Sequence, residues 1–282
     1  MTKVTADMVK ELRERSGVGM GKCKEALDVC GGDMEKAVDH LRKTGMASAV
    51  KKEGREVNEG LISFAESAKA FALVEINSET DFVAQNDRFK QFIKDVAQDV
   101  ADTTPASLDA FLNQTYSKDA TVTVDQFRAL TMQSLGENIK IKRFLVIPKS
   151  SDLSIGIYSH MNGKIITTVT LTGGEGNEAF ARELAMHVAA ESPEFLSPEQ
   201  VPAEAKAREE EIAKVQVEGK PANIVDKIVE GKIKAYYDQV CFVCQKYIKD
   251  NAKSIAEVVA AEGKKQGKNI TVQSFQRWKV GG

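Results

Sequence analysis

Apolar residues recur at helical spacing in three short stretches near the start of the chain. Thr5 and Asp33 each stand just before one of these stretches, where their side-chain oxygens can cap a helix. We therefore predict three short helices over residues 1–45, and then a polar, solvated tether over residues 46–60. The three apolar stripes consist of Met8, Val9 and Leu12, of Cys23, Ala26, Leu27 and Cys30, and of Met34, Ala37, Val38 and Leu41.

The pattern beyond the tether occurs twice. Each copy has two strand-like runs, then helical periodicity, then a closing strand. The closing strands are introduced by the similar segments Gly136-Glu137-Asn138-Ile139 and Gly267-Lys268-Asn269-Ile270. We predict an α+β fold with two subdomains, 61–148 and 149–282, each a three-stranded antiparallel sheet covered by helices. The predicted strands are 61–65, 71–77 and 139–148 in the first copy, and 153–160, 164–172 and 270–280 in the second, where Asn162-Gly163 predicts a two-residue hairpin turn.

A helical hairpin interrupts the second copy at about residues 197–236. Ser197-Pro198-Glu199-Gln200 has the form of a capping box with proline at the first helical position. A highly charged helix follows, and Gly219-Lys220-Pro221 is expected to turn the chain. The return helix is predicted from the apolar stripe Ile224, Val225, Ile228, Val229 and Ile233.

A strand-like run that ends at Ile76 is followed by an acid and a large aromatic, Asp81 and Phe82. Thr80 or Asp81 is a predicted N-cap of a helix whose apolar residues are Phe89, Phe92, Ile93, Val96 and Val100. Phe82 then lies in the first turn, at the rim of the fold. It is either a hydrophobic staple of this helix or a wedge that enters a partner, with Asp81 acting on the partner's polar groups.

Composition and charge narrow the function classes. The 282 residues carry a formal net charge of −2, so no overall basic field favours direct binding of nucleic acid. The N-terminus lacks the apolar core of a signal peptide, and no run is long enough to span a bilayer. We expect a soluble, cytoplasmic protein that does not bind membranes.

Motifs for catalysis, metals or cofactors are lacking in the sequence. Cys241 and Cys244 form a lone C-x-x-C pair, for which buried free thiols are the favoured interpretation and a thiol enzyme the open alternative. The three histidines, His40, His160 and His187, are scattered, and His187 lies on a largely apolar predicted helix as a core residue. Gly173-Gly174-Glu175-Gly176 lacks the lysine of a phosphate-binding loop and is a predicted turn. We expect no cofactor, no metal, no bound nucleotide and no enzymatic activity.

Two segments resemble signatures of one protein family. Residues 77–84, Asn-Ser-Glu-Thr-Asp-Phe-Val-Ala, resemble the Thr-Asp-Phe-Val signature of bacterial translation elongation factor Ts, the guanine-nucleotide exchange factor for elongation factor Tu. The N-terminal signature of that family is similar to Leu12–Met20, Cys23–Leu27, Gly32-Asp33 and Leu41–Lys43 here, in the same order and at similar distances. The first 45 residues also resemble a ubiquitin-associated (UBA) domain. An adaptor that uses this UBA-like unit without exchange activity is the alternative hypothesis.

The resemblance implies a mechanism and a set of contact residues. In the family, the loop that corresponds to residues 80–83 inserts between two helices of the GTPase domain of elongation factor Tu and dislodges Mg²⁺ from its supports. The family's hairpin insertion projects from the core. Two features depart from the family: Lys22 stands where an acid is common, and the C-terminal helical module of longer members has no counterpart after Gly282. The positions that correspond to family contacts are Thr80, Asp81, Phe82 and Val83, with Leu12, Met20, Leu135 and His160. We expect Leu12 to leave exposed apolar surface on the N-terminal helices.

Overall fold

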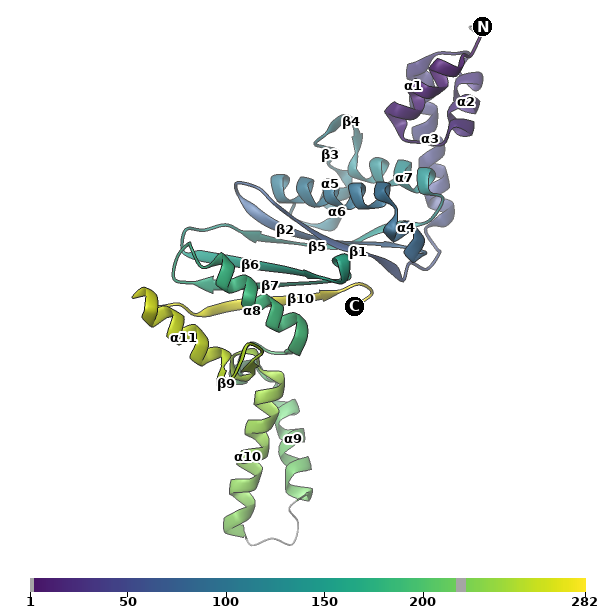
Figure 1. The fold of residues 1–282 in the computed structure, drawn as a ribbon. Coiled ribbons are helices and arrows are strands. Elements are labelled where there is room, and N and C mark those ends of the chain that lie inside the picture. Colours follow the sequence, from purple (N-terminus) through teal and green to yellow (C-terminus); the bar gives the residue numbers. More distant parts are fainter. Residues whose placement is uncertain (1–2, 217–221) are drawn as a thin grey trace. The chain divides into compact units, whose positions relative to one another are not determined.

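The computed structural model describes residues 3–216 and 222–282 and has an α+β fold, as predicted (Figure 1). The chain forms two compact units. The first runs to Lys149 and includes Asn162–Lys164 and Lys279–Gly282, and the second comprises Ser150–Met161 and Ile165–Trp278. The first unit contains α1 (Ala6–Ser16), α2 (Met20–Val29), α3 (Met34–Lys52), β1 (Glu59–Glu66), β2 (Ala70–Ser78), α4 (Asp81–Gln85), α5 (Asp87–Thr103), α6 (Leu108–Asn113), β3 (Thr115–Tyr116), β4 (Asp119–Thr123), α7 (Val124–Leu135) and β5 (Ile139–Pro148). The second contains β6 (Leu153–His160), β7 (Ile165–Thr172), α8 (Glu178–Glu191), α9 (Ala203–Val215), α10 (Ala222–Val240), β8 (Lys246–Tyr247), β9 (Asp250–Ser254), α11 (Ile255–Gln266) and most of β10 (Val272–Lys279).

The N-terminal helices α1, α2 and α3 form at the predicted places. Thr5 caps α1 by accepting a hydrogen bond from Met8 N, and Asp33 caps α3 by accepting one from Lys36 N. Their apolar stripes pack into a small core of their own. The sequence predicts the helices correctly because caps and apolar stripes are local signals.

The expected tether over residues 46–60 is wrong over its first half. Helix α3 continues to Lys52, and Ala49 on it is 3% exposed within the core of the first unit. Its neighbour is α7, which comes so close at Gly45 that an added Cβ would lie 3.4 Å from Gln133 Oε1. The charged residues from Lys51 onward suggested a solvated linker, whereas a few small and apolar residues on one face suffice for packing against a second helix.

Strands β1, β2 and β5 form the antiparallel sheet of the first unit, in that spatial order. Figure 1 shows α5 and α7 on one side of this sheet. The predicted stripe of Phe89, Phe92, Ile93, Val96 and Val100 is buried in the core between α5 and the sheet, as expected. One predicted helix is in fact two, however, because Asn86 has an extended backbone (φ −66°, ψ 137°) and caps α5 after α4 has ended.

The second unit repeats this plan with β6, β7 and β10, where β7 is the central strand. Helix α8 packs on β6 and β7, so the predicted internal repeat is confirmed. The predicted two-residue turn at Asn162-Gly163 is wrong, because His160 pairs with Ile165 and four residues connect the strands. Met161 and Asn162 both have left-handed backbone (φ 51° and 53°), which lengthens the turn.

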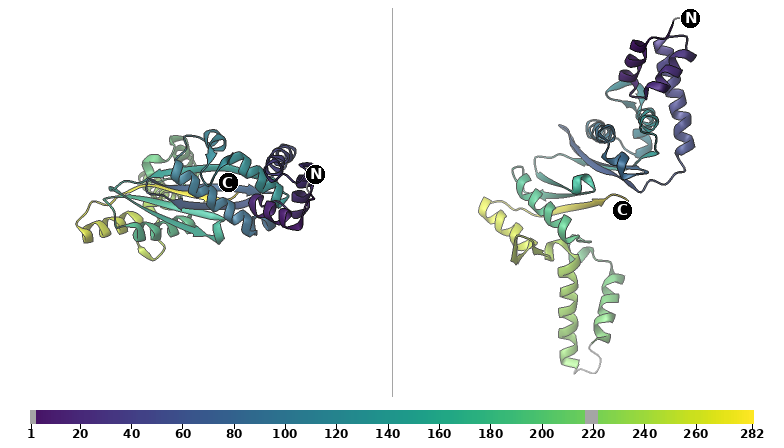
Figure 2. Two further views of the ribbon diagram at one scale, coloured as in Figure 1. Left: turned by 90° about the horizontal axis from the view of Figure 1, so that it is seen from above. Right: turned by 45° about the vertical axis from the view of Figure 1, so that its right-hand side comes forward.

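Helices α9 and α10 form the predicted hairpin and run side by side (Figure 2, right). The capping box expected at Ser197 does not form: Pro198–Gln200 is a single 3₁₀ turn without a side-chain cap, and the charged helix begins only after Pro202. The return helix extends to Val240, beyond the expected residue 236. The expected turn at Gly219-Lys220-Pro221 lies outside the described residues.

Candidate functional site

The segment that follows β2 carries the most exposed aromatic side chain among the described residues. β2 is buried along almost its whole length and ends at Ser78. Thr80 then caps α4, and its hydroxyl accepts a hydrogen bond from Val83 N at 3.3 Å. We call residues 80–83 the rim loop. Since it begins where a buried central strand ends, its first residue has little freedom to move.

Two carboxylates tie the rim loop to the segment before β5. The Glu137 carboxylate accepts two hydrogen bonds from Thr80, one from the backbone N–H at 3.0 Å and one from the side-chain hydroxyl at 2.6 Å. In the opposite direction, Glu79 accepts the backbone N–H of Asn138 at 2.5 Å. Each segment thus supplies a carboxylate to the backbone of the other, and hydrogen bonds of this charge-assisted kind are the stronger ones.

Phe82 is 88% exposed, Asp81 is exposed and Val83 is half-buried, whereas Ala84 is fully buried. The staple interpretation of Phe82 is therefore wrong, because a staple packs against its own helix. An aromatic ring held in water on a fixed backbone is available to another molecule. Asp81 stands beside it at the start of α4, where the N-terminal end of a helix favours a negative charge.

Leu135 lies close to the rim loop in the fold. It ends α7, is half-buried against the core of the first unit, and is followed by Gly136 with left-handed backbone (φ 86°). The next residue is Glu137, which binds Thr80. The structure therefore brings Leu135 and the rim loop together.

Leu12 and Met20 differ in exposure. Met20 is 53% exposed at the start of α2, whereas Leu12 is fully buried in the core of α1, α2 and α3. The expectation that Leu12 leaves exposed apolar surface is therefore wrong, because α2 and α3 cover the stripe of α1. These helices are attached near Leu135, since Ser134 Oγ donates to Gly17 O at 2.8 Å.

His160 belongs to the second unit, whereas the residues described above belong to the first. It is exposed at the end of β6, and its Nδ1 lies 3.3 Å from the hydroxyl of Tyr158. Met161, which follows, is 64% exposed.

The remaining candidates from the sequence have structural roles. His187 is fully buried; its Nδ1 accepts from Ile248 N at 3.4 Å and its Nε2 then donates to Gln245 Oε1 at 2.9 Å. Burial lowers the pKa of His187, so the ring is neutral. Burial also raises the pKa of Cys241 to about 11, which removes the thiolate that a thiol enzyme needs.

Sequence reasoning missed Glu137 and Glu79. One signal was available: the two segments that introduce the closing strands are similar, yet Glu137 in the first copy is replaced by Lys268 in the second. A charge reversal at equivalent positions of a repeat indicates that the residue contacts something different in each copy.

Metal and membrane sites have no support in the described parts of the chain. Within residues 3–216 and 222–282, no three His, Cys, Asp or Glu side chains are grouped so that they could hold a metal ion. No described helix combines the length and the apolar character that crossing a bilayer requires.

Comparison with known proteins identifies relatives of the whole chain. The family model described as Elongation factor TS matches residues 79–282. A protein named Elongation factor Ts from Protochlamydia amoebophila (strain UWE25) is 58% identical over 281 residues, which cover 100% of both chains. Proteins of the same name from Chlamydia caviae and Chlamydia trachomatis serovar L2 are 44% and 42% identical over the same length, again with 100% of each chain covered. The chain belongs to the elongation factor Ts family.

Proposed function

We propose that this chain is the guanine-nucleotide exchange factor for elongation factor Tu in the elongation phase of protein synthesis, and that the rim loop carries its activity. Membership of the elongation factor Ts family supports the exchange reaction and the partner. The observation that supports the role of the rim loop is the 88% exposure of Phe82 on a segment whose first residue is held by Glu137.

In this proposal Phe82 enters the GTPase domain of elongation factor Tu as a preformed wedge. A loop that is ordered before contact loses little conformational entropy on binding, so more of the contact energy remains for distorting the partner. Leu135 adds apolar surface in the same cleft, and Met20 and His160 contact other parts of the partner. Leu12 acts indirectly, by supporting the helices that present Met20.

The chemical target is the Mg²⁺ ion that elongation factor Tu holds with its GDP. A bound divalent cation is a large local charge, and it neutralises the phosphates next to it. Displacing the side chains that support this ion weakens the binding of GDP. Asp81, which is exposed beside Phe82, would act on the same polar groups of the partner.

The decisive experiment measures the release of fluorescently labelled GDP from elongation factor Tu. Phe82→Ala should slow stimulated release at least about tenfold, equivalent to roughly 1.4 kcal/mol, while melting of the protein barely changes. Phe64→Ala is the matched control, because Phe64 is a second exposed phenylalanine of the first unit, 45% exposed on β1. Wild-type stimulated release with Phe82→Ala would remove the ring from the mechanism, whereas the absence of any stimulation by the wild-type protein would favour the UBA-like adaptor hypothesis.

Chelation of Mg²⁺ distinguishes the proposed effect of the rim loop on the metal from the effects of other contacts with elongation factor Tu. Excess EDTA removes the charge that the rim loop is proposed to displace, so the fold-stimulation of GDP release should shrink markedly. The double variant Asp81→Ala/Phe82→Ala should depend less on Mg²⁺ than the wild type. Equal stimulation in millimolar Mg²⁺ and in excess EDTA would remove the metal from the mechanism and leave exchange to other contacts.

A further inference from the structure

Strand β10 leaves one edge of its sheet open. In the spatial order β10-β7-β6 it has β7 on one side, and no strand of the described residues pairs with its other side. Unpaired N–H and C=O groups along such an edge are a template for an added strand. Several β10 side chains, among them Gln273 and Ser274, are also exposed.

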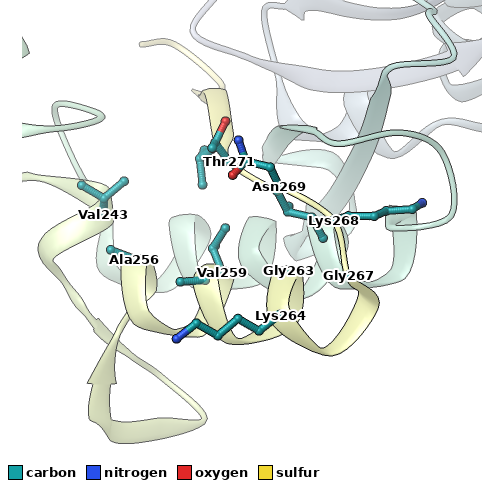
Figure 3. Close-up of a pocket in the computed structure, with 12 residues that line it drawn as sticks. Val243, Ala256, Val259, Gly263, Lys264, Gly267, Lys268, Asn269 and Thr271 are labelled. Atoms are coloured by element: carbon teal, nitrogen blue, oxygen red, sulfur yellow. The ribbon is translucent and has the colours of Figure 1, made fainter.

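An apolar cavity of about 640 Å³ lies at the beginning of this strand. Figure 3 shows α11 along one side of it and the segment with Asn269 and Thr271, which leads into β10, along the other. Val259 and Ile270 are buried and contribute apolar surface. Ala260 on α11 is small, which leaves room for a side chain from outside.

The rim of this cavity is basic. Lys264 and Lys268 line it, and its lining includes no carboxylate. Lys268 is held in place, since its Nζ donates to Glu175 O at 3.3 Å. Two lysines and no carboxylate in a largely apolar lining favour an occupant that combines apolar and acidic side chains.

A second, more polar cavity of about 480 Å³ continues along the same strand. It is lined by residues 273–277 of β10 and by part of the segment 192–200. Arg277 contributes a guanidinium whose Nε is buried and has no hydrogen-bond partner among the described residues. Glu194 is the one acid of its lining, so this end is mixed in charge but offers an unsatisfied donor.

We propose that the two cavities and the β10 edge between them, together the β10 groove, bind an extended acidic and apolar peptide segment of a partner protein by strand addition. Such recognition takes affinity from main-chain hydrogen bonds and specificity from pockets for alternate side chains. Residues 272–277 offer about 20 Å of edge at roughly 3.3 Å per residue, which suits a segment of about six residues. This inference is independent of the proposed exchange function.

The test uses the full chain and a synthetic probe. A capped, fluorescein-labelled peptide of eight alternating valines and aspartates should bind saturably in fluorescence anisotropy. In ¹⁵N NMR spectra, the amides of β10 and α11 should shift on titration. The same peptide with lysine in place of aspartate tests charge, and one N-methylated on alternate amides tests main-chain pairing. Both are expected to bind at least about tenfold more weakly.

Matched variants on α11 test the groove itself. Ala260→Phe should fill the apolar cavity and weaken probe binding at least about tenfold, whereas Ala261→Phe, at the next residue and outside the lining, should not. Lys264→Glu should weaken binding about fivefold, whereas Lys265→Glu should not, because Lys265 is outside the lining and pairs with Glu262 at 3.5 Å.

Three results would overturn the proposal. They are the absence of saturable binding by the acidic probe, equal binding by the N-methylated probe, and equal effects of the groove variants and their controls. Concentration-dependent dimerisation that shifts the same β10 amides without any probe would assign the edge to a second copy of the chain instead.

Discussion

Replacement of Glu137 by alanine tests whether the fixed position of the rim loop matters. The Glu137 carboxylate accepts two hydrogen bonds from Thr80, at 3.0 and 2.6 Å, and Glu137 itself is half-buried. Glu137→Ala removes both bonds and leaves Phe82 unchanged. The variant therefore separates the order of the loop from the contact surface of the aromatic ring.

The expected magnitudes follow from these two bonds. A hydrogen bond to a charged group contributes about 1.5–3 kcal/mol when well shielded, and solvent at the rim lowers this, so we expect a total loss of about 2 kcal/mol in unfolding free energy. Fixing the backbone of one residue costs about 1–2 kcal/mol, and the partner must supply this for a loosened loop. Stimulated GDP release at a subsaturating factor concentration should then fall roughly five- to thirtyfold.

Urea unfolding and stopped-flow release of labelled GDP measure the two quantities. Glu137→Gln should be intermediate, because an amide oxygen still accepts the Thr80 N–H. Glu66→Ala is the matched control. Glu66 is an ion-paired acid, bound to Lys149, and it lies at the end of β1 that is far from the rim loop. If Glu137→Ala stimulates GDP release at the wild-type rate while hydrogen exchange of the Val83 amide rises, preorganisation of the loop is not required for exchange.

Four further predictions concern the supporting structure. Leu12→Ala should cost ~2–5 kcal/mol in the N-terminal helices, because Leu12 is fully buried, and hydrogen exchange in α1 to α3 should rise while protection of β2 is kept. Cys241 should react with Ellman's reagent at pH 8 far more slowly than a cysteine of ordinary pKa, because raising the pKa from 9.0 to about 11 lowers the thiolate fraction about a hundredfold. Cys241→Ser/Cys244→Ser should keep full exchange activity, and loss of exchange with the fold intact would return the thiol-enzyme hypothesis. Because the pKa of His187 is lowered in the folded state, the unfolded chain binds a proton at this residue at a higher pH than the folded chain does. The free energy of unfolding should therefore fall as the pH drops from about 6.5 toward the folded-state pKa. Urea titrations at each pH measure this dependence, which should be weaker for His187→Gln.

Features set by a few neighbouring residues were predictable from the sequence. Thr5 and Asp33 cap helices as expected, since capping depends on one side chain and the backbone within three residues. Thr80, one of the two predicted caps, caps the short helix α4, whereas Asn86 caps the helix that carries the predicted stripe. The strands of the two three-stranded sheets were also predicted, because β-forming runs bounded by turn residues mark them, whereas the short two-stranded sheets β3-β4 and β8-β9 were not. The break between α4 and α5 was missed because the apolar stripe continues across Asn86, which starts a new helix there.

Features set by a distant segment were not predictable in the same way. Burial of Leu12 depends on α2 and α3, and burial of Ala49 depends on the approach of α7. A periodic stripe shows which face of a helix is apolar but not what covers it. The bond between Glu137 and Thr80 joins residues 57 positions apart, so only the fold brings them together.

The internal repeat provides a comparison within one chain. In each copy, the residue after a left-handed glycine, Gly136 or Gly267, reaches the turn that follows the central strand. Glu137 accepts hydrogen bonds from Thr80 in the first copy, whereas in the second Lys268 donates to the carbonyl of Glu175. The same device therefore fixes both turns with opposite charge, but only the first turn leads into an exposed aromatic, since the second is the glycine-rich segment 173–176. The fold alone thus supplies a fixed turn, and the proposed wedge arises from the placement of Phe82 on one of the two.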